Sequence, residues 1–320
     1  NQGDYDVDQF LGYDPEKETL YYTSHQESVL EKHVYSIELD GGQQQRLSSR
    51  AGNNSASFSK GFRYFILTHN SANSPTLVTL HNAKGKEIRV LEDNARLKER
   101  IRVYGFAPTE FMSIPTASGQ ELNAWMIKPA DFNPSSQYPL VVYVYGGPES
   151  QNVIDRWNAR SGWFQLLAQK GYIIACVDNR GTNGRGEAFR KATYMRLGEL
   201  ETIDQLEAAR WLGSQDYIDE ERMGIYGWSY GGYMSSLCMV KGKGLFKMGI
   251  AGAPVTTWRY YDTVYTERFL RTPQENPEGY DQNSPIRFAS GLQGKFLLIH
   301  GTGDDNVHFQ NSVDFSEALV

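Results

Sequence analysis

A serine between two glycines, with apolar segments on both sides, is the feature that most constrains how this chain can fold. Residues Met223–Tyr226 have the composition of a short buried strand, and the sequence G-W-S-Y-G follows directly at positions 227–231. The two glycines lack a Cβ, so they permit a tight turn and a close approach of the helix that Gly232–Val240 can form. A glycine-rich loop is the alternative interpretation. The apolar flanks instead favour the strand–turn–helix nucleophile motif of an α/β-hydrolase, with Ser229 as the nucleophile.

An acid that could orient a catalytic base lies in the loop after a later apolar strand. Residues Phe296–Ile299 are apolar, and the polar segment 302–309 follows them. Catalytic groups of open α/β sheets lie at the carboxyl ends of the strands, and in this fold the chain order is serine, acid, histidine. Asp304 and Asp305 are both candidates for the acid, and the spacing alone leaves them nearly even.

No histidine in the sequence is well placed to act as the base. His308 is the only histidine after Asp304, and four residues separate the two. A base must be oriented by the acid and must also reach Ser229, which makes so close a histidine a poor candidate. His300 lies on the apolar strand and is predicted to serve in packing or in a loop hydrogen bond. We therefore expect the chain to be a fragment of a longer enzyme whose catalytic histidine follows Val320.

Composition limits the classes of function. The 320 residues carry a net charge of −6 and have a mean hydropathy of −0.53. No basic stripe is present, which argues against a nucleic-acid partner, and no apolar run reaches the 18 residues of a membrane span. Cys176 and Cys238 both lie in apolar segments and are predicted to be buried thiols. No metal or organic cofactor is implied.

Residues 1–106 have a β-rich pattern in which short aromatic and β-branched runs alternate with turn residues. One unit combines Leu20–Thr23 with His33–Leu47, and a second combines Tyr64–Leu67 with Leu77–Leu91. The two units begin 44 positions apart, at residues 20 and 64, which is within the range of four-stranded propeller blades. A piece of a β-sandwich is the alternative. We predict that this region is the C-terminal part of a β-propeller.

Residues 107–320 alternate between strand and helix patterns after an initial hairpin at 111–127. This alternation predicts a mostly parallel sheet with helices on both faces, an α/β-hydrolase domain that stops before its last strand and helix. The predicted strands are Leu140–Tyr145, Tyr172–Val177, Met223–Tyr226, Met248–Ala251 and Phe296–Ile299, and the predicted helices are Trp163–Lys170, Ile203–Leu212, Gly232–Val240 and Gln310–Leu319.

Two further groups of side chains fit an acyl-transfer site. Tyr145 follows the first parallel strand, where its hydroxyl could stabilise an oxyanion beside the backbone N–H of Tyr230. The alternative is that Tyr145 only packs at the strand end. The aromatic residues Trp258, Tyr261 and Tyr265 follow the strand at Met248–Ala251 and could form a pocket or simply pack between helices.

Three long segments resemble serine peptidases of the dipeptidyl peptidase IV type, in the prolyl oligopeptidase clan. They are G-W-S-Y-G-G-Y at 227–233, the segment at 253–268, and the segment at 300–309, and the resemblance covers nearly the whole chain. It implies the end of an eight-bladed propeller followed by a peptidase domain. It also implies a serine exopeptidase that releases N-terminal Xaa-Pro or Xaa-Ala dipeptides through an acyl-enzyme. A homodimer and an extracytoplasmic location, periplasmic or at the cell surface, are further expectations from the family.

The resemblance also implies individual roles. It makes Ser229 the nucleophile, Asp304 rather than Asp305 the triad acid, and Tyr145 with the amide of Tyr230 the oxyanion site. Asn306 matches the residue that binds the carbonyl of the N-terminal substrate residue. The residues that match the pocket for the penultimate proline are Tyr230, Val255, Trp258, Tyr261, Tyr265 and Val307.

Two parts of the family pattern fall outside this sequence. One is the catalytic histidine, and the other is the propeller segment whose paired glutamates bind the free amino terminus of the substrate. Release of tripeptides or action as another oligopeptidase of the clan therefore stays an alternative, as does a non-catalytic binding homologue. An intact G-W-S-Y-G-G segment with Ser229 and Asp304 favours the enzyme.

Overall fold

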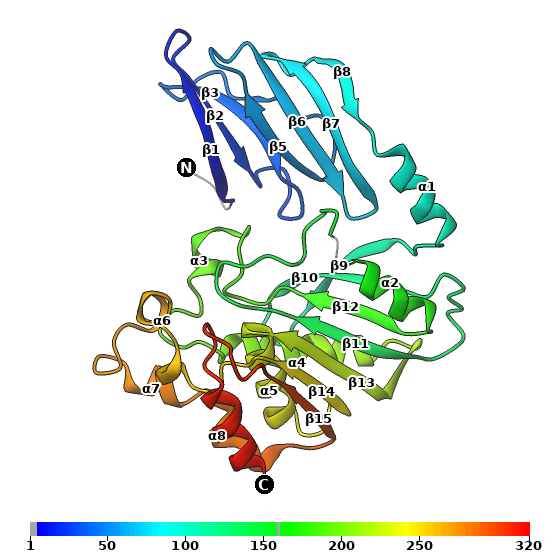
Figure 1. The fold of residues 1–320 in the computed structure, drawn as a ribbon, viewed down its shortest axis with the longest axis vertical. Coiled ribbons are helices and arrows are strands. Elements are labelled where there is room, and N and C mark those ends of the chain that lie inside the picture. Colours follow the sequence, from blue (N-terminus) through cyan, green and yellow to red (C-terminus); the bar gives the residue numbers. More distant parts are fainter. Residues whose placement is uncertain (1–4, 159–160) are drawn as a thin grey trace. The chain divides into compact units, whose positions relative to one another are not determined.

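The computed structural model describes residues 5–158 and 161–320, which form two compact units. The first unit contains the residues up to Thr109 together with 154–163 and 184–187, and the second contains 110–153, 164–183 and 188–320. Figure 1 shows the elements of both units in chain order.

The first unit consists of two four-stranded antiparallel sheets. In each sheet the strand order follows the chain order, as in a propeller blade. The two sheets share an apolar cluster that includes Tyr21, Val34 and Phe65. The predicted blades are confirmed. The strands are β1 (Val7–Asp14), β2 (Thr19–Ser24), β3 (His33–Glu38) and β4 (Gln45–Arg46) in the first sheet, and β5 (Asn53–Phe58), β6 (Tyr64–Ser71), β7 (Ser74–Asn82) and β8 (Glu87–Glu92) in the second.

Helix α1 (Ala95–Val103) follows β8 and was not predicted from the sequence. None of its residues is buried. A helical period is recognised over a window of about 11–18 residues, and α1 has nine residues.

The second unit is built on one seven-stranded sheet with the order β15-β14-β13-β11-β12-β10-β9. Strands β11 to β15 run parallel to one another, and β10 pairs with β12 in the antiparallel direction. This mixed, mostly parallel sheet confirms the predicted α/β-hydrolase class. The strands are β9 (Thr109–Pro115), β10 (Glu121–Ile127), β11 (Tyr138–Val144), β12 (Ile173–Val177), β13 (Ile218–Trp228), β14 (Met248–Gly252) and β15 (Lys295–Ile299).

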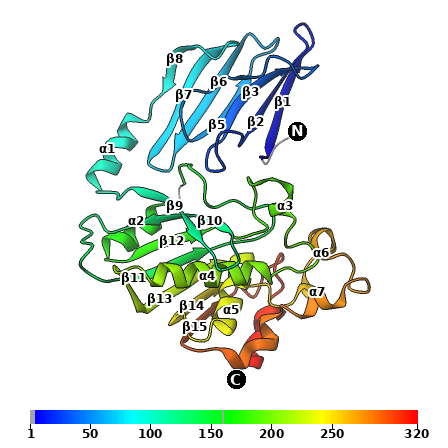
Figure 2. The ribbon, with the colours of Figure 1, turned by 180° about the vertical axis from the view of Figure 1, so that it is seen from behind.

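Helices cover the two faces of this sheet unequally. Figures 1 and 2 show α4 (Leu200–Gly213) and α5 (Tyr230–Lys241) on one face and α2 (Ser161–Gln169) on the other. Side chains alternate along a strand, so Val142 and Val144 of β11 are buried toward α5, while the ring of Tyr143 packs 5.1 Å from that of Phe164 in α2.

The face of β13–β15 opposite α5 exposes apolar side chains. Trp228, Met248 and Leu297 are exposed by 49%, 42% and 52%. The prediction of helices on both faces therefore holds around β11 and β12, whereas the described part of β13–β15 is covered on one face.

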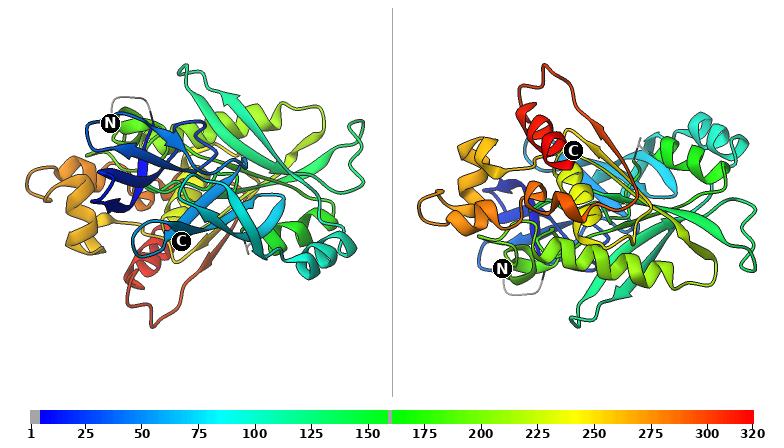
Figure 3. Two further views of the ribbon diagram at one scale, coloured as in Figure 1. Left: turned by 90° about the horizontal axis from the view of Figure 1, so that it is seen from above. Right: turned by 90° about the horizontal axis from the view of Figure 1, so that it is seen from below.

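The remaining helices are short, and most of them follow β14 in the chain. Helix α8 (Gln310–Leu319) packs on η2 (Pro285–Gly291) through Phe315 and Ala289, and is red in Figure 3. No helix of the described residues is long and apolar enough to span a bilayer. The other short helices, which were not predicted, are α3 (Gly186–Arg190), η1 (Trp258–Tyr260), α6 (Thr263–Leu270) and α7 (Pro277–Asp281).

Glycines allow the first turn of α5 to lie directly on the sheet. A Cβ at Gly231 would overlap the carbonyl oxygen of Val144 in β11, and one at Gly232 would lie 2.5 Å from that of Gly252 in β14. Both neighbours are backbone atoms of central strands and cannot move aside locally.

Replacing Gly231 should therefore destabilise the second unit strongly. We expect Gly231→Ala to lower the free energy of unfolding by about 2–4 kcal/mol, because the added methyl group overlaps the β11 backbone. Gly162→Ala is the matched control: Gly162 lies in α2, and a methyl group added there would have no atom within 4 Å, so alanine should be neutral or stabilise by up to about 1 kcal/mol. Urea unfolding of both variants measures the difference, and equal stability of the two would contradict the close approach.

Candidate active site

Ser229 lies at the turn between β13 and α5 in a backbone conformation that non-glycine residues rarely adopt. Its φ and ψ are 59° and −119°. Such a conformation costs on the order of 1–3 kcal/mol and persists only where the surrounding structure enforces it. Here the amide of Ser229 donates to the Gly252 carbonyl at 2.8 Å, and the Ser229 carbonyl accepts from the Tyr233 amide at 3.0 Å. The half-buried serine is thus held on the strained turn that a nucleophile motif requires.

Tyr230 is the first residue of α5, immediately after Ser229. The N–H groups of the first helical turn have no partner within the helix, and the positive end of the helix dipole lies there. An amide in this position can stabilise a negative oxygen near Ser229, as predicted for the oxyanion site.

Tyr145 follows the last residue of β11, and its ring packs against that of Tyr230 with 6.1 Å between the centroids. Burial raises the pKa of the Tyr145 phenol, with a smaller contribution from Tyr261. The hydroxyl therefore stays protonated and able to donate at neutral pH. The next residue, Gly146, has φ +71°, and its carbonyl accepts from the Asn179 side chain at 3.0 Å, which fixes the loop.

Asp304 lies in the loop after β15, and its carboxylate organises that loop. Its Oδ1 accepts from the amides of Asn306 at 3.0 Å and Val307 at 2.9 Å. Asp305, in contrast, is exposed. Asp304 is thus half-buried and hydrogen-bonded, and its role as the acid stays a prediction.

The two histidines near this loop differ in their surroundings. The His300 side chain is 1% exposed, with Nδ1 2.6 Å from Ser312 Oγ and Nε2 2.8 Å from the Val307 carbonyl. Its Nε2 also lies 3.5 Å from Asp304 Oδ2. Both ring nitrogens thus take part in hydrogen bonds, Nε2 with the loop, as predicted for His300, and Nδ1 with Ser312 of the helix 310–319. His308 is exposed in the turn before α8.

The structure brings the four aromatic residues of the predicted pocket into one cluster. The Trp258 ring lies 5.4 Å from that of Tyr230, 5.9 Å from that of Tyr261 and 6.0 Å from that of Tyr265. The Tyr261 hydroxyl donates to Asn306 Oδ1 at 2.9 Å, which connects the cluster to the Asp304 loop. The buried members of the same apolar core are Tyr230, Val255, Trp258 and Val307.

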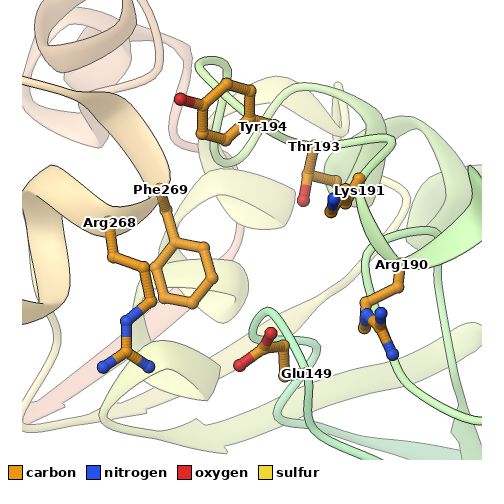
Figure 4. A pocket seen from close by; sticks show the side chains of 7 residues that line it. All are labelled: Glu149, Arg190, Lys191, Thr193, Tyr194, Arg268 and Phe269. Atoms are coloured by element: carbon orange, nitrogen blue, oxygen red, sulfur yellow. The ribbon is translucent and has the colours of Figure 1, made fainter. Parts of the chain in front are cut away.

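A hollow lies beside this cluster and was not predicted. It has a volume of about 420 Å³, and Figure 4 shows the side chains around it. Its Phe269 ring lies 4.9 Å from that of Tyr265, so the two regions adjoin. Three separate segments contribute to it, and for that reason no local sequence pattern indicates it. The lining residues are Glu149, Arg190, Lys191, Thr193, Tyr194, Arg268 and Phe269.

Two buried carboxyl groups with raised pKa values, Glu201 and Asp178, also lie in the second unit and were missed by sequence reasoning. Glu201 in α4 accepts a hydrogen bond at 2.8 Å from the Tyr230 hydroxyl, and burial raises the pKa of Glu201 to about 7. Asp178 accepts from the amides of Asn152 and Val153, and burial raises its pKa to about 6. The predicted helix began at Ile203, so Glu201 lay outside it and no signal marked it as buried.

Comparison with known proteins places this geometry among peptidases. Residues 157–320 match the prolyl oligopeptidase family, and residues 1–76 match the dipeptidyl peptidase IV N-terminal region. A crystal structure of Porphyromonas gingivalis dipeptidyl peptidase 4 superposes with a TM-score of 0.96 at 49% sequence identity, covering 100% of this chain and 45% of that one.

Curated fungal relatives agree with this match. A probable dipeptidyl peptidase 4 of Aspergillus flavus is 38% identical over 100% of this chain and 42% of its own length. A probable dipeptidyl-aminopeptidase B of Emericella nidulans is 38% identical over 98% of this chain and 35% of its own length. The chain therefore spans less than half the length of these relatives.

The two buried carboxyl groups predict a loss of stability as the pH rises. A carboxyl whose pKa is higher in the folded than in the unfolded state stabilises the fold below the unfolded pKa, and this stabilisation is lost as the pH rises through the folded value. With ordinary values of 4.5 for Glu201 and 3.8 for Asp178, we expect the free energy of unfolding to fall between pH 5 and pH 7.

Replacing each carboxyl group with the uncharged amide of similar shape measures its separate contribution to this pH dependence of the unfolding free energy. Glu201→Gln should reduce the difference in unfolding free energy between pH 5 and pH 7 by about 2 kcal/mol, and Asp178→Asn by about 1 kcal/mol. Urea unfolding of the wild type and both variants at the two pH values is the measurement. A Glu201→Gln variant that keeps the full pH dependence of the wild type would contradict the raised pKa.

Proposed function

The chain belongs to the prolyl oligopeptidase family. From this membership we propose that it provides the nucleophile, the triad acid and the proline pocket of a serine exopeptidase. The proposed enzyme releases Xaa-Pro or Xaa-Ala dipeptides from peptide N-termini. The strained turn at Ser229 is the observation that carries the proposal. A binding protein gains nothing from an energetically costly serine conformation, whereas a nucleophile needs its hydroxyl presented above the sheet.

Ser229 attacks the carbonyl carbon of the penultimate residue while a histidine takes the hydroxyl proton. The carbonyl oxygen becomes an oxyanion that accepts hydrogen bonds from the Tyr230 amide and the Tyr145 hydroxyl. The histidine then passes the proton to the departing amine, and water hydrolyses the resulting ester by the reverse sequence. Asp304 orients the histidine and stabilises its charged form.

The histidine of this mechanism is proposed to lie outside the 320 residues. His300 uses both ring nitrogens in hydrogen bonds, and His308 is four residues from its acid. A serine without an adjacent base is a weak nucleophile. The 320-residue chain alone is therefore proposed to be inactive.

The aromatic cluster supports a preference for proline. Proline is compact, with a fixed φ and no N–H, so a pocket bounded by Trp258, Tyr261 and Tyr265 can enclose the ring without an amide partner. Burial of about three methylene groups contributes roughly 2 kcal/mol at about 0.8 kcal/mol each. Alanine also fits, and larger side chains clash, so exclusion contributes more to selectivity than attraction does.

Asn306 can anchor the N-terminal residue of the substrate. Its Oδ1 accepts from the Tyr261 hydroxyl, and its Nδ2 group can donate to a substrate carbonyl oxygen. Release of dipeptides rather than tripeptides, a homodimeric state and an extracytoplasmic location stay predictions from the resemblance.

Labelling with a fluorophosphonate tests the nucleophile. In a polypeptide that includes this chain and hydrolyses Gly-Pro-p-nitroanilide, we expect the label on Ser229, and we expect Ser229→Ala to reduce kcat about 10⁴–10⁶-fold. Ser235 and Ser236 are completely buried and serve as internal controls. A label on either of them would contradict the assignment. Hydrolysis of the substrate by the 320-residue chain alone would contradict the proposed external base.

Replacement of Tyr145 tests the oxyanion role. Tyr145→Phe should lower kcat about 10²–10³-fold, because the hydroxyl stabilises charge that develops only in the transition state. KM should change much less for the same reason. The alternative is that the ring only packs against Tyr230, and the phenylalanine ring preserves that contact. A folded Tyr145→Phe variant with wild-type kcat on Gly-Pro-p-nitroanilide would eliminate the hydroxyl from the mechanism.

A further inference from the structure

Tyr230 is the one residue of the nucleophile turn whose side chain is held in the protein core. Its neighbours Gly227, Gly231 and Gly232 have no side chain, and Trp228 is 49% exposed. Tyr230 itself is 2% exposed. The position of the turn therefore depends on how this one side chain is held.

Two kinds of contact hold the Tyr230 side chain. Its ring packs 5.4 Å from the rings of both Tyr233 and Trp258. Its hydroxyl, the one polar group of the side chain, donates to Glu201 Oε1 at 2.8 Å, and Glu201 is fully buried on α4. The hydrogen bond thus connects α4 to the first residue of α5 across the inside of the unit.

We propose that Glu201 is a positioning residue for catalysis, because its carboxyl group holds the Tyr230 side chain in place. Held in this way, Tyr230 keeps its backbone amide beside Ser229 and its ring beside Trp258 in the aromatic cluster. This inference rests on the proposed function of Ser229 and the Tyr230 amide. Glu201 contacts no substrate and acts through Tyr230.

The geometry explains why a carboxyl group suits this position. Both the neutral and the ionised carboxyl group can accept from the tyrosine hydroxyl, and the ionised form accepts the stronger bond. Burial favours the neutral form, and the Tyr230 bond opposes that effect. The charged and titratable groups that act on Glu201 from the surrounding elements are Arg180, Asp204, Tyr230, Tyr233, Lys241 and Tyr265.

Variants of a polypeptide that includes this chain test the proposal, with Gly-Pro-p-nitroanilide as the substrate. Glu201→Ala removes the acceptor, Glu201→Gln keeps an acceptor oxygen without the charge, and Tyr230→Phe removes the donor. Tyr233→Phe is the matched control, because Tyr233 is also buried on α5 but its hydroxyl lies within hydrogen-bond distance of the carbonyls of Leu197 and Asn283 and is not bonded to Glu201.

We expect Glu201→Ala and Tyr230→Phe each to lower kcat per titrated active site about tenfold or more, and to slow fluorophosphonate labelling of Ser229 similarly. Glu201→Gln should stay within about threefold of the wild type, and Tyr233→Phe should lose stability without losing kcat. The double variant Glu201→Ala/Tyr230→Phe should be no slower than the single variants, because all three break the same hydrogen bond.

Several results would overturn the proposal. They are wild-type kcat and labelling rate in a folded Glu201→Ala variant, losses that multiply in the double variant, and equal kcat for Tyr230→Phe and Tyr233→Phe. If Glu201→Ala does not fold, the comparison of kcat between Tyr230→Phe and Tyr233→Phe tests the proposal. If the wild type labels at Ser229 but hydrolyses no dipeptidyl substrate, the proposed function fails, and the labelling rates of the same variants still measure the role of Glu201.

Discussion

The close contact between the start of α5 and the carboxyl ends of β11 and β14 is the constraint on which the site depends. Gly231 lies against the Val144 carbonyl and Gly232 against the Gly252 carbonyl, with no room for a Cβ. This contact fixes the turn between β13 and α5 so tightly that Ser229 can hold a strained conformation. The Tyr145 loop and the Asp304 loop both follow strands of the same sheet, so one rigid layer positions groups that are 159 residues apart in sequence.

Much of this arrangement could be predicted because the relevant signals are local. Alternation of apolar strands and helices gave the class of the second unit, and the G-W-S-Y-G segment gave the position of Ser229. The regular spacing of two β-rich sequence repeats indicated the propeller blades of the first unit. Helices α1 and α6 were missed because their nine and eight residues are too few for a clear helical period.

The parts of the site that were not predictable depend on contacts between distant segments. Glu201 and Tyr230 are 29 residues apart, and nothing near Glu201 in the sequence marks a buried carboxyl group. The preference for Asp304 over Asp305 needed the resemblance, and in the structure it corresponds to hydrogen bonds from Asn306 and Val307. The hollow at Arg190 and Arg268 combines three segments, so only the folded chain reveals it. The roles of the site residues in catalysis stay predictions.

Buried polar groups give the second unit a directional framework that apolar packing alone would not provide. Arg180 binds Asp204 through its guanidinium group and its backbone amide, Asp178 holds the loop at Asn152, and Glu201 holds Tyr230. A buried carboxyl oxygen without a partner is costly, and Glu201 Oε2 has no hydrogen-bond partner among the described residues, so the Tyr230 bond to Oε1 is the more important for that group. Apolar side chains can slide or change rotamer at small cost, whereas a hydrogen bond depends on both distance and angle. A site that must aim an amide at an oxyanion to within a fraction of an ångström therefore gains more from a bond such as that between Tyr230 and Glu201 than from additional apolar contact.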